Sequence, residues 1–251
     1  MDTAGDTFSS VLQRIKNDCA WETMPETDIP LLAALCGPLE IKALIQSLDT
    51  LDNADLIDDA GDMADEYWRL RTALSRVLAA VGQPGVEPLL GALHSPNRAT
   101  QEYAARALGQ IGDTRAFGPL CLLLAHDADH NDWRPGVIGA LGDLKDRRAI
   151  PVLLPYLNPA HDQVNRGWII RITANALGNI GTDSVIGPLC DVIKMDHDWF
   201  ARLGAVEGLA KMSERSNPRV TEALQIALSD SDGRVQAEAK RALQPKVRPT
   251  N

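Results

Sequence analysis

Residues 107–113 read Ala-Leu-Gly-Gln-Ile-Gly-Asp, and residues 176–181 read Ala-Leu-Gly-Asn-Ile-Gly. Variants of this pattern recur at 78–82, 140–143, 208–212 and 242–243. Each copy has one leucine that we call its anchor leucine: Leu78, Leu108, Leu141, Leu177, Leu209 and Leu243. Successive anchors are separated by 30, 33, 36, 32 and 34 residues. A period of this length is typical of a repeat array, in which each unit buries its apolar faces against its neighbours.

A second apolar segment follows each of the first five anchors, after a short turn rich in glycine and aspartate. In four of these five segments a proline lies near the start, where its missing N–H costs little and its φ angle already suits a helix. We expect Gly112, Gly142 and Gly181 to reverse the chain after the first helix of their units. The sequence therefore predicts an all-α fold, an α-solenoid (superhelix) of helical hairpin repeats.

The repeats are predicted to occupy residues 61–244 as about five and a half units, because the last unit, 230–244, has only its first helix. Residues 1–60 fit the pattern poorly, and we expect them to form a divergent N-terminal helical cap. Helices within this cap are predicted at about 6–18, 28–36 and 38–50. The proline-containing end, 245–251, is expected to be a flexible tail.

The repeat itself resembles a known family. Its clearest copies run from Ala104 to Leu120 and from Arg171 to Leu189, each with Ala-Leu-Gly-x-Ile-Gly followed by Gly-Pro-Leu. This pattern is similar to the short HEAT-like repeat named after the phycobilin (phycocyanobilin) lyases of the E/F type, over about 180 residues. The resemblance implies proteins that attach linear tetrapyrroles (bilins) to phycobiliprotein cysteines, chaperones of phycobiliproteins, or relatives that assist iron–sulfur assembly.

The composition and charge of the sequence limit the classes of molecule that the protein is expected to bind. The formal net charge is −9, and the sequence contains no basic face of the kind that nucleic acids require, so we expect no nucleic-acid partner. No signal segment and no apolar run long enough to span a membrane appears, which predicts a cytoplasmic protein without a membrane span. The stretch from Asp49 to Glu66 holds eight acids and no base. It is either a solvated helix face with a loop or a docking surface for a basic partner.

Arginines and tryptophans recur at fixed distances before the anchor leucines. The arginines lie six or seven residues before an anchor: Arg71, Arg134, Arg171 and Arg202. The tryptophans lie eight to ten residues before an anchor: Trp68, Trp133, Trp168 and Trp199. In three of the four units the tryptophan precedes the arginine by three residues, which would place ring and cation on one helix face.

These eight residues are our candidate binding site, and each has two interpretations. In the structural one, each arginine pairs with an aspartate or a backbone carbonyl of the neighbouring repeat, for which the turn residues Asp113, Asp143 and Asp183 are candidates, and the tryptophans pack between repeats. In the functional one, the guanidinium groups hold bilin propionates, and the indoles form an aromatic wall that stacks on a tetrapyrrole or anchors a protein.

The histidines and cysteines favour no metal site, although His126 and His130 have an i, i+4 spacing that can bind a metal on a helix; the segment around them is typical of a loop. Three His-Asp pairs begin at His126, His161 and His197, with His130 close to the first, and we expect the aspartates to cap helices and the histidines to be exposed. HEAT-repeat hydroxylases that hold two irons use His-Glu pairs, and this sequence has none. The four cysteines form no Cys-x-x-Cys motif and are expected to be buried and reduced: Cys19, Cys36, Cys121 and Cys190.

Two functions follow from these observations. In the first, the protein is a phycobilin lyase or chaperone that binds a phycobiliprotein and orients a bilin for attack by a thiol of the partner, so that it needs no catalytic cluster of its own. It would then hold no permanent cofactor, and the bilin would be a substrate. In the second, it is a scaffold or assembly factor for photosystem or iron–sulfur assembly that acts only through a protein partner. A second HEAT-repeat subunit is a further candidate partner.

Overall fold

The structure is a computed structural model that describes residue 13 and residues 28–50, 65–126, 134–158, 165–212 and 217–244. All regular structure in these ranges is helical, and they contain no β-strand, which confirms the predicted all-α solenoid. The chain divides into two compact units, Met1–Leu120 (unit 1) and Cys121–Asn251 (unit 2). Helix α7, Phe117–His126, crosses the division.

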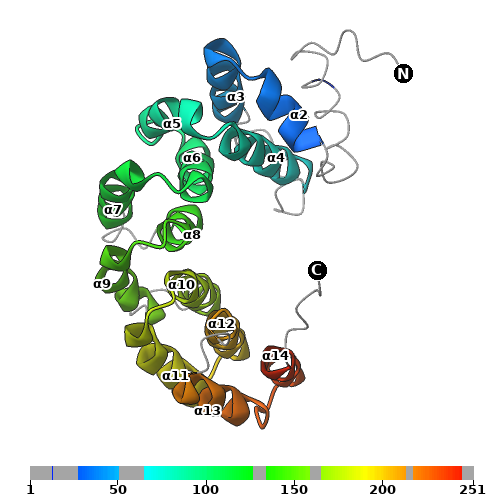
Figure 1. The fold of residues 1–251 in the computed structure, drawn as a ribbon, viewed down its shortest axis with the longest axis vertical. Coiled ribbons are helices and arrows are strands. Elements are labelled where there is room, and N and C mark those ends of the chain that lie inside the picture. The colour runs from blue at the N-terminus through cyan, green and yellow to red at the C-terminus, as the bar shows by residue number, and fades with distance from the viewer. Residues whose placement is uncertain are drawn as a thin grey trace, which may run out of the picture. The chain divides into compact units, whose positions relative to one another are not determined.

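Unit 1 contains two layers of helices. One layer holds α2, α4 and α6, and the other holds α3 and α5 (Figure 1). Their bounds are α2 Asp28–Leu35, α3 Pro38–Thr50, α4 Asp65–Val81, α5 Val86–Ala92 and α6 Arg98–Ile111. Helices α2 and α3 agree with the helices predicted at 28–36 and 38–50. The helix predicted at 6–18, most of the acidic stretch and the tail at 245–251 lie outside the described residues.

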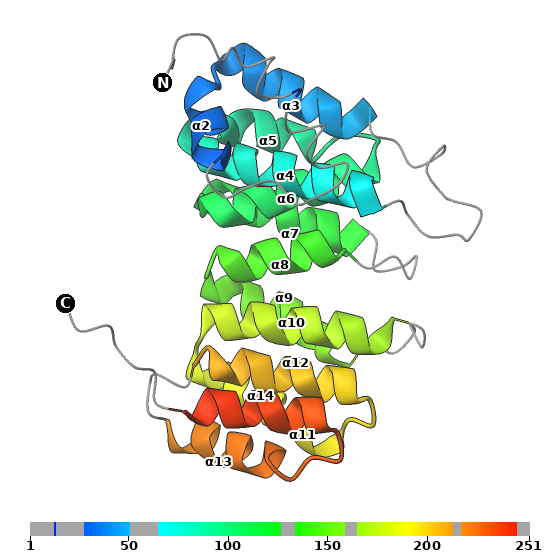
Figure 2. The same cartoon turned by 90° about the vertical axis from the view of Figure 1, so that its right-hand side faces the viewer.

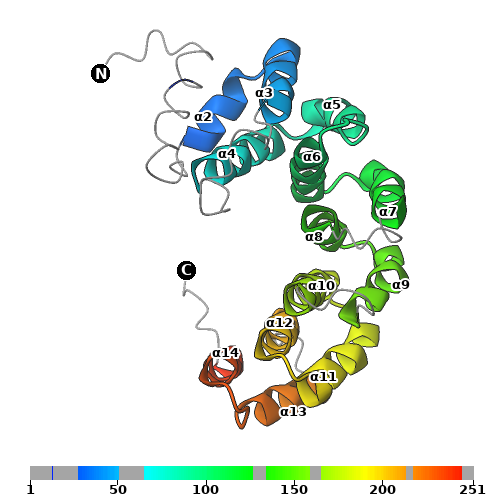
Figure 3. The same cartoon turned by 180° about the vertical axis from the view of Figure 1, so that it is seen from behind.

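Unit 2 repeats the same alternation. Its first-helix layer consists of α8, α10, α12 and α14, and its second-helix layer consists of α9, α11 and α13 (Figures 1 and 3). The first-helix layer has the bounds α8 Pro135–Asp143, α10 Arg166–Ile180, α12 Trp199–Ala210 and α14 Gly233–Leu243. The second-helix layer has the bounds α9 Ile150–Leu153, α11 Ile186–Met195 and α13 Pro218–Ala227. Figure 2 shows α10, α12 and α14 lying side by side.

The anchor leucines form the core between the two layers of each unit. Five of the six are fully buried: Leu78, Leu108, Leu141, Leu177 and Leu209. Leu243 is only half-buried, because no further helix follows α14 in the described chain. Burial of each such side chain stabilises the fold by roughly 1.5–3 kcal/mol, which explains why this position carries the repeat pattern.

Short 3₁₀ turns precede four of the second helices: η2 Gln83–Gly85, η3 Thr114–Ala116, η5 Arg147–Ala149 and η7 Asp183–Val185. Aspartates cap two of these turns, since Asp113 accepts from the backbone N–H of Arg115 and Asp146 does so from Arg148. A fifth 3₁₀ segment, η6 Leu154–Leu157, follows α9 at once. Pro155 lies in the first turn of this segment, where its missing N–H costs little.

The glycine prediction is confirmed at two positions and wrong at the third. Gly112 and Gly181 end their helices with φ angles of 77° and 66°, a left-handed conformation that favours glycine. Gly142 instead lies inside α8, and the reversal there uses Lys145, whose φ is 53°. Gly142 is needed for another reason: a Cβ atom at this position would overlap the backbone of Ala176 in α10.

Two more glycines mark close approaches of neighbouring helices in unit 2. A Cβ atom at Gly178 of α10 would overlap the backbone of Gly208 in α12, and one at Gly204 of α12 would overlap Arg171 of α10. The helices of the first-helix layer therefore pack backbone against backbone at these points. Such contact leaves a densely packed floor beneath the outward-facing side chains.

Candidate functional site

A groove of about 600 Å³ runs over the first-helix layer of unit 2. All four helices of the layer contribute side chains to it: Gly139 and Asp143 from α8; Trp168, Arg171, Ile172, Asn175, Ala176 and Asn179 from α10; Glu207 and Ala210 from α12 with Lys211 just after it; Arg241 and Ala242 from α14. Its volume lies within the range of ligand pockets in proteins. We call it the inner groove.

An aromatic stack stands at one end of the inner groove. Trp168, in the first turn of α10, lies parallel to Phe200 of α12, with 5.6 Å between ring centroids and 8° between planes. Asp198 caps α12 by accepting from the backbone N–H of Phe200, which fixes where this helix begins. Trp168 remains 45% exposed, although large aromatic side chains are usually much more buried. The stack thus presents an indole that is oriented by contact with Phe200 and accessible from the groove.

Arg171 forms the polar centre of the groove. Its Nε and Nη2 donate to the two carboxylate oxygens of Glu207 at 2.9 and 2.6 Å, a bidentate pair between α10 and α12. Asn175 donates a third hydrogen bond to Glu207 at 2.8 Å. Desolvation is the largest single cause acting on the pKa of Glu207 and raises it, but the hydrogen bonds from Arg171 and Asn175 and the charges of Arg171 and Lys211 together outweigh it, so that the pKa is lowered. The Arg171 guanidinium carbon also lies 4.5 Å from the Phe200 ring centroid, which links the ion pair to the aromatic stack.

The far side of the groove carries a lysine and a second amide. Lys211 donates to the backbone carbonyl of Asn175 at 3.2 Å, and its pKa is lowered because desolvation outweighs the attraction of Asp143 and Glu207. Asn179 donates to Asp143 at 2.8 Å, between α10 and α8. The groove is therefore lined by groups whose positions are fixed by contacts between neighbouring helices.

Of the six predicted binding residues whose side chains the structure describes, two line the inner groove, Trp168 and Arg171. Arg71 and Arg134 are buried, with exposed fractions of 1% and 7%. The side chains of Trp68 and Trp133 lie outside the described part of the chain.

Trp168 and Arg171 both line the inner groove, as predicted for a ring and a cation on one helix face, but the described ring–cation contacts at Arg171 and at Trp199 join neighbouring helices. The ring beside Arg171 is Phe200, and the cation over Trp199 is Arg234, whose guanidinium carbon lies 3.2 Å from the ring centroid. These partners belong to neighbouring repeats and not to the same helix. Sequence spacing within a helix could not reveal them, because stacking of the repeats decides them.

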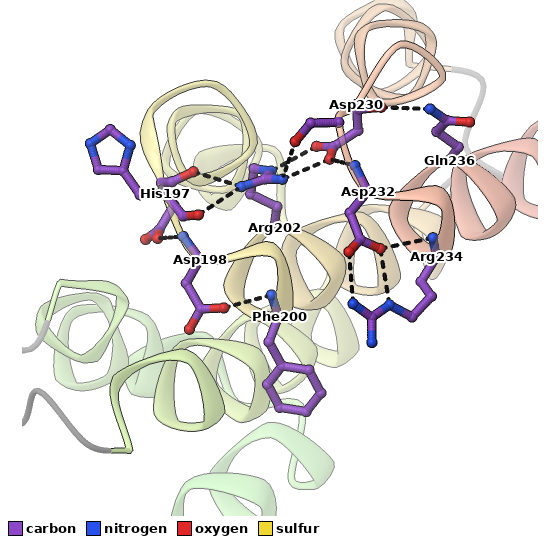
Figure 4. A network of polar contacts seen from close by, with 10 residues as sticks. His197, Asp198, Phe200, Arg202, Asp230, Asp232, Arg234 and Gln236 are labelled. Atoms are coloured by element: carbon purple, nitrogen blue, oxygen red, sulfur yellow. Dashed lines mark hydrogen bonds and ion pairs between the residues drawn. The ribbon is translucent and has the colours of Figure 1, made fainter.

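Arg202 pairs with an aspartate of the neighbouring repeat, as predicted, since it donates to both carboxylate oxygens of Asp230 at 2.7 Å (Figure 4). Arg171 instead pairs with Glu207, and neither arginine uses one of the three candidate turn aspartates. Asp113 pairs with Arg115 of its own turn instead. The Arg202 pair is nearly buried, with side-chain exposures of 10% and 5%, and Arg202 also donates to the carbonyls of Asp196 and His197. These contacts support the structural interpretation of Arg202.

A repeated loop motif, which sequence analysis missed, accounts for these pairs. Within the described residues, two loops carry Asp-x-Asp before a first helix, at 196–198 and 230–232. In each, the first aspartate accepts a bidentate arginine from the preceding repeat, Arg166 or Arg202, and the second caps the helix. Figure 4 shows the second of these loops, with Arg202 on Asp230. The alternation of aspartates was visible in the sequence, but only His-Asp was singled out there.

The histidine prediction is confirmed where it can be checked. His197 is exposed, and Asp198 caps α12. The other two His-Asp pairs and His130 fall outside the described side chains. Within the described residues, no group of three or more His, Cys, Asp or Glu side chains is arranged to hold a metal ion. None of the described helices is both long and apolar enough to cross a membrane.

The cysteines are free, as predicted for the three that the structure describes, but they are half-buried and not fully buried: Cys36, Cys121 and Cys190. Burial is the largest cause that raises the pKa of each thiol, to about 11 at Cys36. A raised pKa lowers the fraction of reactive thiolate at neutral pH. None of these three thiols is therefore activated as a nucleophile.

Comparison with known proteins finds a repeat family and two solved structures of low similarity. A solved complex of CpcE and CpcF of phycocyanin lyase from Nostoc sp. PCC7120 is similar at 19% identity and a TM-score of 0.49, over 96% of this chain and 95% of that one. Human deoxyhypusine hydroxylase is similar at 16% identity and a TM-score of 0.40, over 94% and 96%. Curated proteins give no significant match. The model for HEAT repeats matches residues 86–172 and 169–244, more than half of the sequence, and the chain therefore belongs to the HEAT-repeat family.

Proposed function

We propose that this protein is a scaffold that holds a partner protein in the inner groove of unit 2, and that the partner is a phycobiliprotein subunit. The observation that carries the binding proposal is the exposed indole of Trp168, held against Phe200 at the end of a groove of about 600 Å³. Tryptophan and arginine are the side chains most often found at the energetic centre of protein interfaces. The choice of partner rests on the resemblance of the repeat to that of the phycobilin lyases.

The groove is suited to binding because its floor and its polar groups are already in place. The glycine contacts between α8, α10 and α12 fix the floor, and the pairing of Arg171 with Glu207 fixes the guanidinium group. A partner that enters the groove therefore meets side chains that lose little further conformational freedom. Prearrangement of this kind favours affinity, since ordering side chains is a main cost of association.

A bilin is a second candidate ligand of the same groove. The specific observation in its favour is that an exposed indole and the cations of Arg171 and Lys211 line one concave surface. A flat tetrapyrrole could stack on the indole, and its propionates could pair with the cations. The attacking thiol in a bilin lyase reaction would come from the partner, which fits the raised pKa values of the thiols at Cys36, Cys121 and Cys190.

Binding measurements with purified phycobiliprotein subunits test the proposal. We expect Trp168→Ala to weaken binding at least tenfold, which corresponds to about 1.4 kcal/mol, because it removes the exposed anchor of the groove. The matched control is Ile226→Ala on α13 in the second-helix layer, which also removes an exposed apolar side chain (41% exposed) and should leave affinity within twofold. Equal weakening by both substitutions, or no binding by the wild type, would contradict the proposal.

Visible absorbance separates the bilin from the protein as ligand. If free bilin binds in the groove, mixing should shift its absorbance, and Trp168→Ala should abolish the shift. A subunit that binds without any bilin effect would support the scaffold alone. A bilin shift that Trp168→Ala does not change would place the bilin elsewhere.

A further inference from the structure

We infer that the segment of the partner that enters the inner groove is acidic, so that its carboxylates meet Arg171, Lys211 and Arg241. This inference rests on the proposed function and adds the chemical class of the segment. It follows from which hydrogen-bonding groups of the groove are already satisfied within the described chain and which are left for a partner.

The acids of the groove are engaged by the protein itself. Both oxygens of Glu207 accept hydrogen bonds, one from Arg171 and the other from Arg171 and Asn175. Asp143 accepts from Asn179 across the contact of α8 and α10. A basic segment would have to compete with these internal donors, so that its cations would gain little in the groove.

The three cationic side chains of the groove have N–H donors that make no hydrogen bond within the described residues. Arg171 uses Nε and Nη2 for Glu207, and within the described residues its Nη1 has no partner. Arg241 likewise uses Nε and Nη2 for Glu238, which leaves Nη1 without a described partner. Lys211 has three donors and makes one described hydrogen bond, to the carbonyl of Asn175. All three side chains line the same groove.

The groove is less acidic than the rest of the chain. The lining residues that the structure describes comprise three cations and two acids, and Glu238, which pairs with Arg241, adds a third acid, whereas the whole chain has a formal net charge of −9. A near-neutral surface with spare N–H donors on an acidic protein favours an acidic segment at that place over the rest of the molecule. The indole of Trp168 adds an apolar contact at the same site, so that the segment should combine carboxylates with an aliphatic or aromatic residue.

Two fluorescein-labelled peptides of 12 residues test this inference by fluorescence anisotropy with the full chain. Both carry the same leucines, and they differ only in having Glu or Lys at every other position. We expect the Glu peptide to bind at least tenfold more tightly than the Lys peptide at low ionic strength, with a difference that shrinks as salt is added. Absent binding of the Glu peptide, or equal or tighter binding of the Lys peptide, overturns the inference.

Two charge-reversing substitutions, one inside the groove and one outside it, test whether the preference for the acidic peptide arises in the groove. Lys211→Glu should weaken binding of the Glu peptide at least fivefold, whereas Lys194→Glu on α11, which changes the net charge equally outside the groove, should change it less than twofold. Equal weakening by both variants means that only net charge matters and overturns the inference. The proposed function has a separate readout: if Trp168→Ala weakens binding of a phycobiliprotein subunit while the two peptides bind equally, the scaffold proposal stands and only the acidic class fails.

Discussion

Units 1 and 2 are built from the same repeat, but they join neighbouring repeats differently. In unit 2 the first helices touch at glycines, where Gly142 meets Ala176 and Gly178 meets Gly208. The second helices do not touch at glycines in either unit: no atom lies within 4 Å of an added Cβ at Gly91 or Gly118, and only a side chain lies near Gly187. The first helices α4 and α6 of unit 1 are linked by a side chain, since Ser75 donates to the carbonyl of Tyr103 at 3.0 Å. The described glycine contacts therefore belong to the first-helix layer of unit 2, over which the inner groove runs.

Two described ion pairs, one from each unit, differ in burial. Arg115 of unit 1 pairs with Glu87 and Asp113 at the surface, and its side chain is 52% exposed. Arg202 of unit 2 pairs with Asp230 in a nearly buried position between two repeats. Exposed pairs contribute little to stability, whereas breaking a buried pair leaves an uncompensated charge. We therefore expect the protein to depend far more on Arg202 than on Arg115.

The largest expected effect follows from this difference. Arg202→Ala should lower the free energy of unfolding by about 3–5 kcal/mol, because Asp230 and two backbone carbonyls would lose their buried donor. Arg115→Ala in unit 1 should cost less than about 1 kcal/mol. Chemical denaturation monitored by circular dichroism measures both changes. Similar losses for the two variants would remove the distinction between the two pairs.

The glycine contacts predict the next largest effect. Gly142→Ala should destabilise the protein by about 1–3 kcal/mol, because the added methyl group overlaps the backbone of Ala176. Gly139→Ala in the same helix is the matched control, since nothing lies within 4 Å of its Cβ position, and it should stabilise α8 by roughly 0.5–1 kcal/mol. Thermal unfolding should thus shift in opposite directions. A neutral or stabilising Gly142→Ala would show that α8 and α10 are not in backbone contact.

A smaller effect is expected from pH. The hydrogen bond from Arg202 is the largest cause that holds the pKa of Asp230 below its ordinary value of 3.8. A carboxylate with a lowered pKa in the folded state stabilises the protein above its unfolded pKa, and this contribution is lost as pH falls through the folded pKa. Stability should therefore fall as the pH drops below about 4. Asp230→Asn should be less stable at neutral pH and should show a weaker dependence on acid, measured as melting temperature between pH 6 and 3.

The fold could be predicted from the sequence because its determinants are local and repeated. The anchor leucines, the prolines near the second helices and the glycines at 112 and 181 each express a property of one hairpin. Gly142 was misplaced because its role is a contact with the next repeat. A glycine after Ala-Leu looks the same in the sequence whether it ends a helix or lies where two helices touch. The sequence of one hairpin therefore cannot distinguish a helix-ending turn from a close contact with the next repeat.

The residues of the inner groove were less predictable, because contacts between neighbouring repeats determine their positions. Trp168 and Arg171 were among the candidates, but the residues that position them, Phe200 and Glu207, come from the following repeat. Lys211 was not predicted to line a groove, since no periodic pattern marks it. The Asp-x-Asp loops are the sequence signal that could have predicted the partners of Arg166 and Arg202. A comparison of these loops between repeats would have been needed to find it.

Site-specific photo-crosslinking tests most directly whether the inner groove holds the partner. A benzoylphenylalanine replaces either Asn179 in the groove or Lys194 on α11 outside it, and each protein is irradiated with purified phycobiliprotein subunits. The predicted result is a crosslinked product from position 179 that Trp168→Ala reduces, with little product from position 194. Crosslinking from position 194 alone, or equal yields from both positions, would contradict binding in the inner groove.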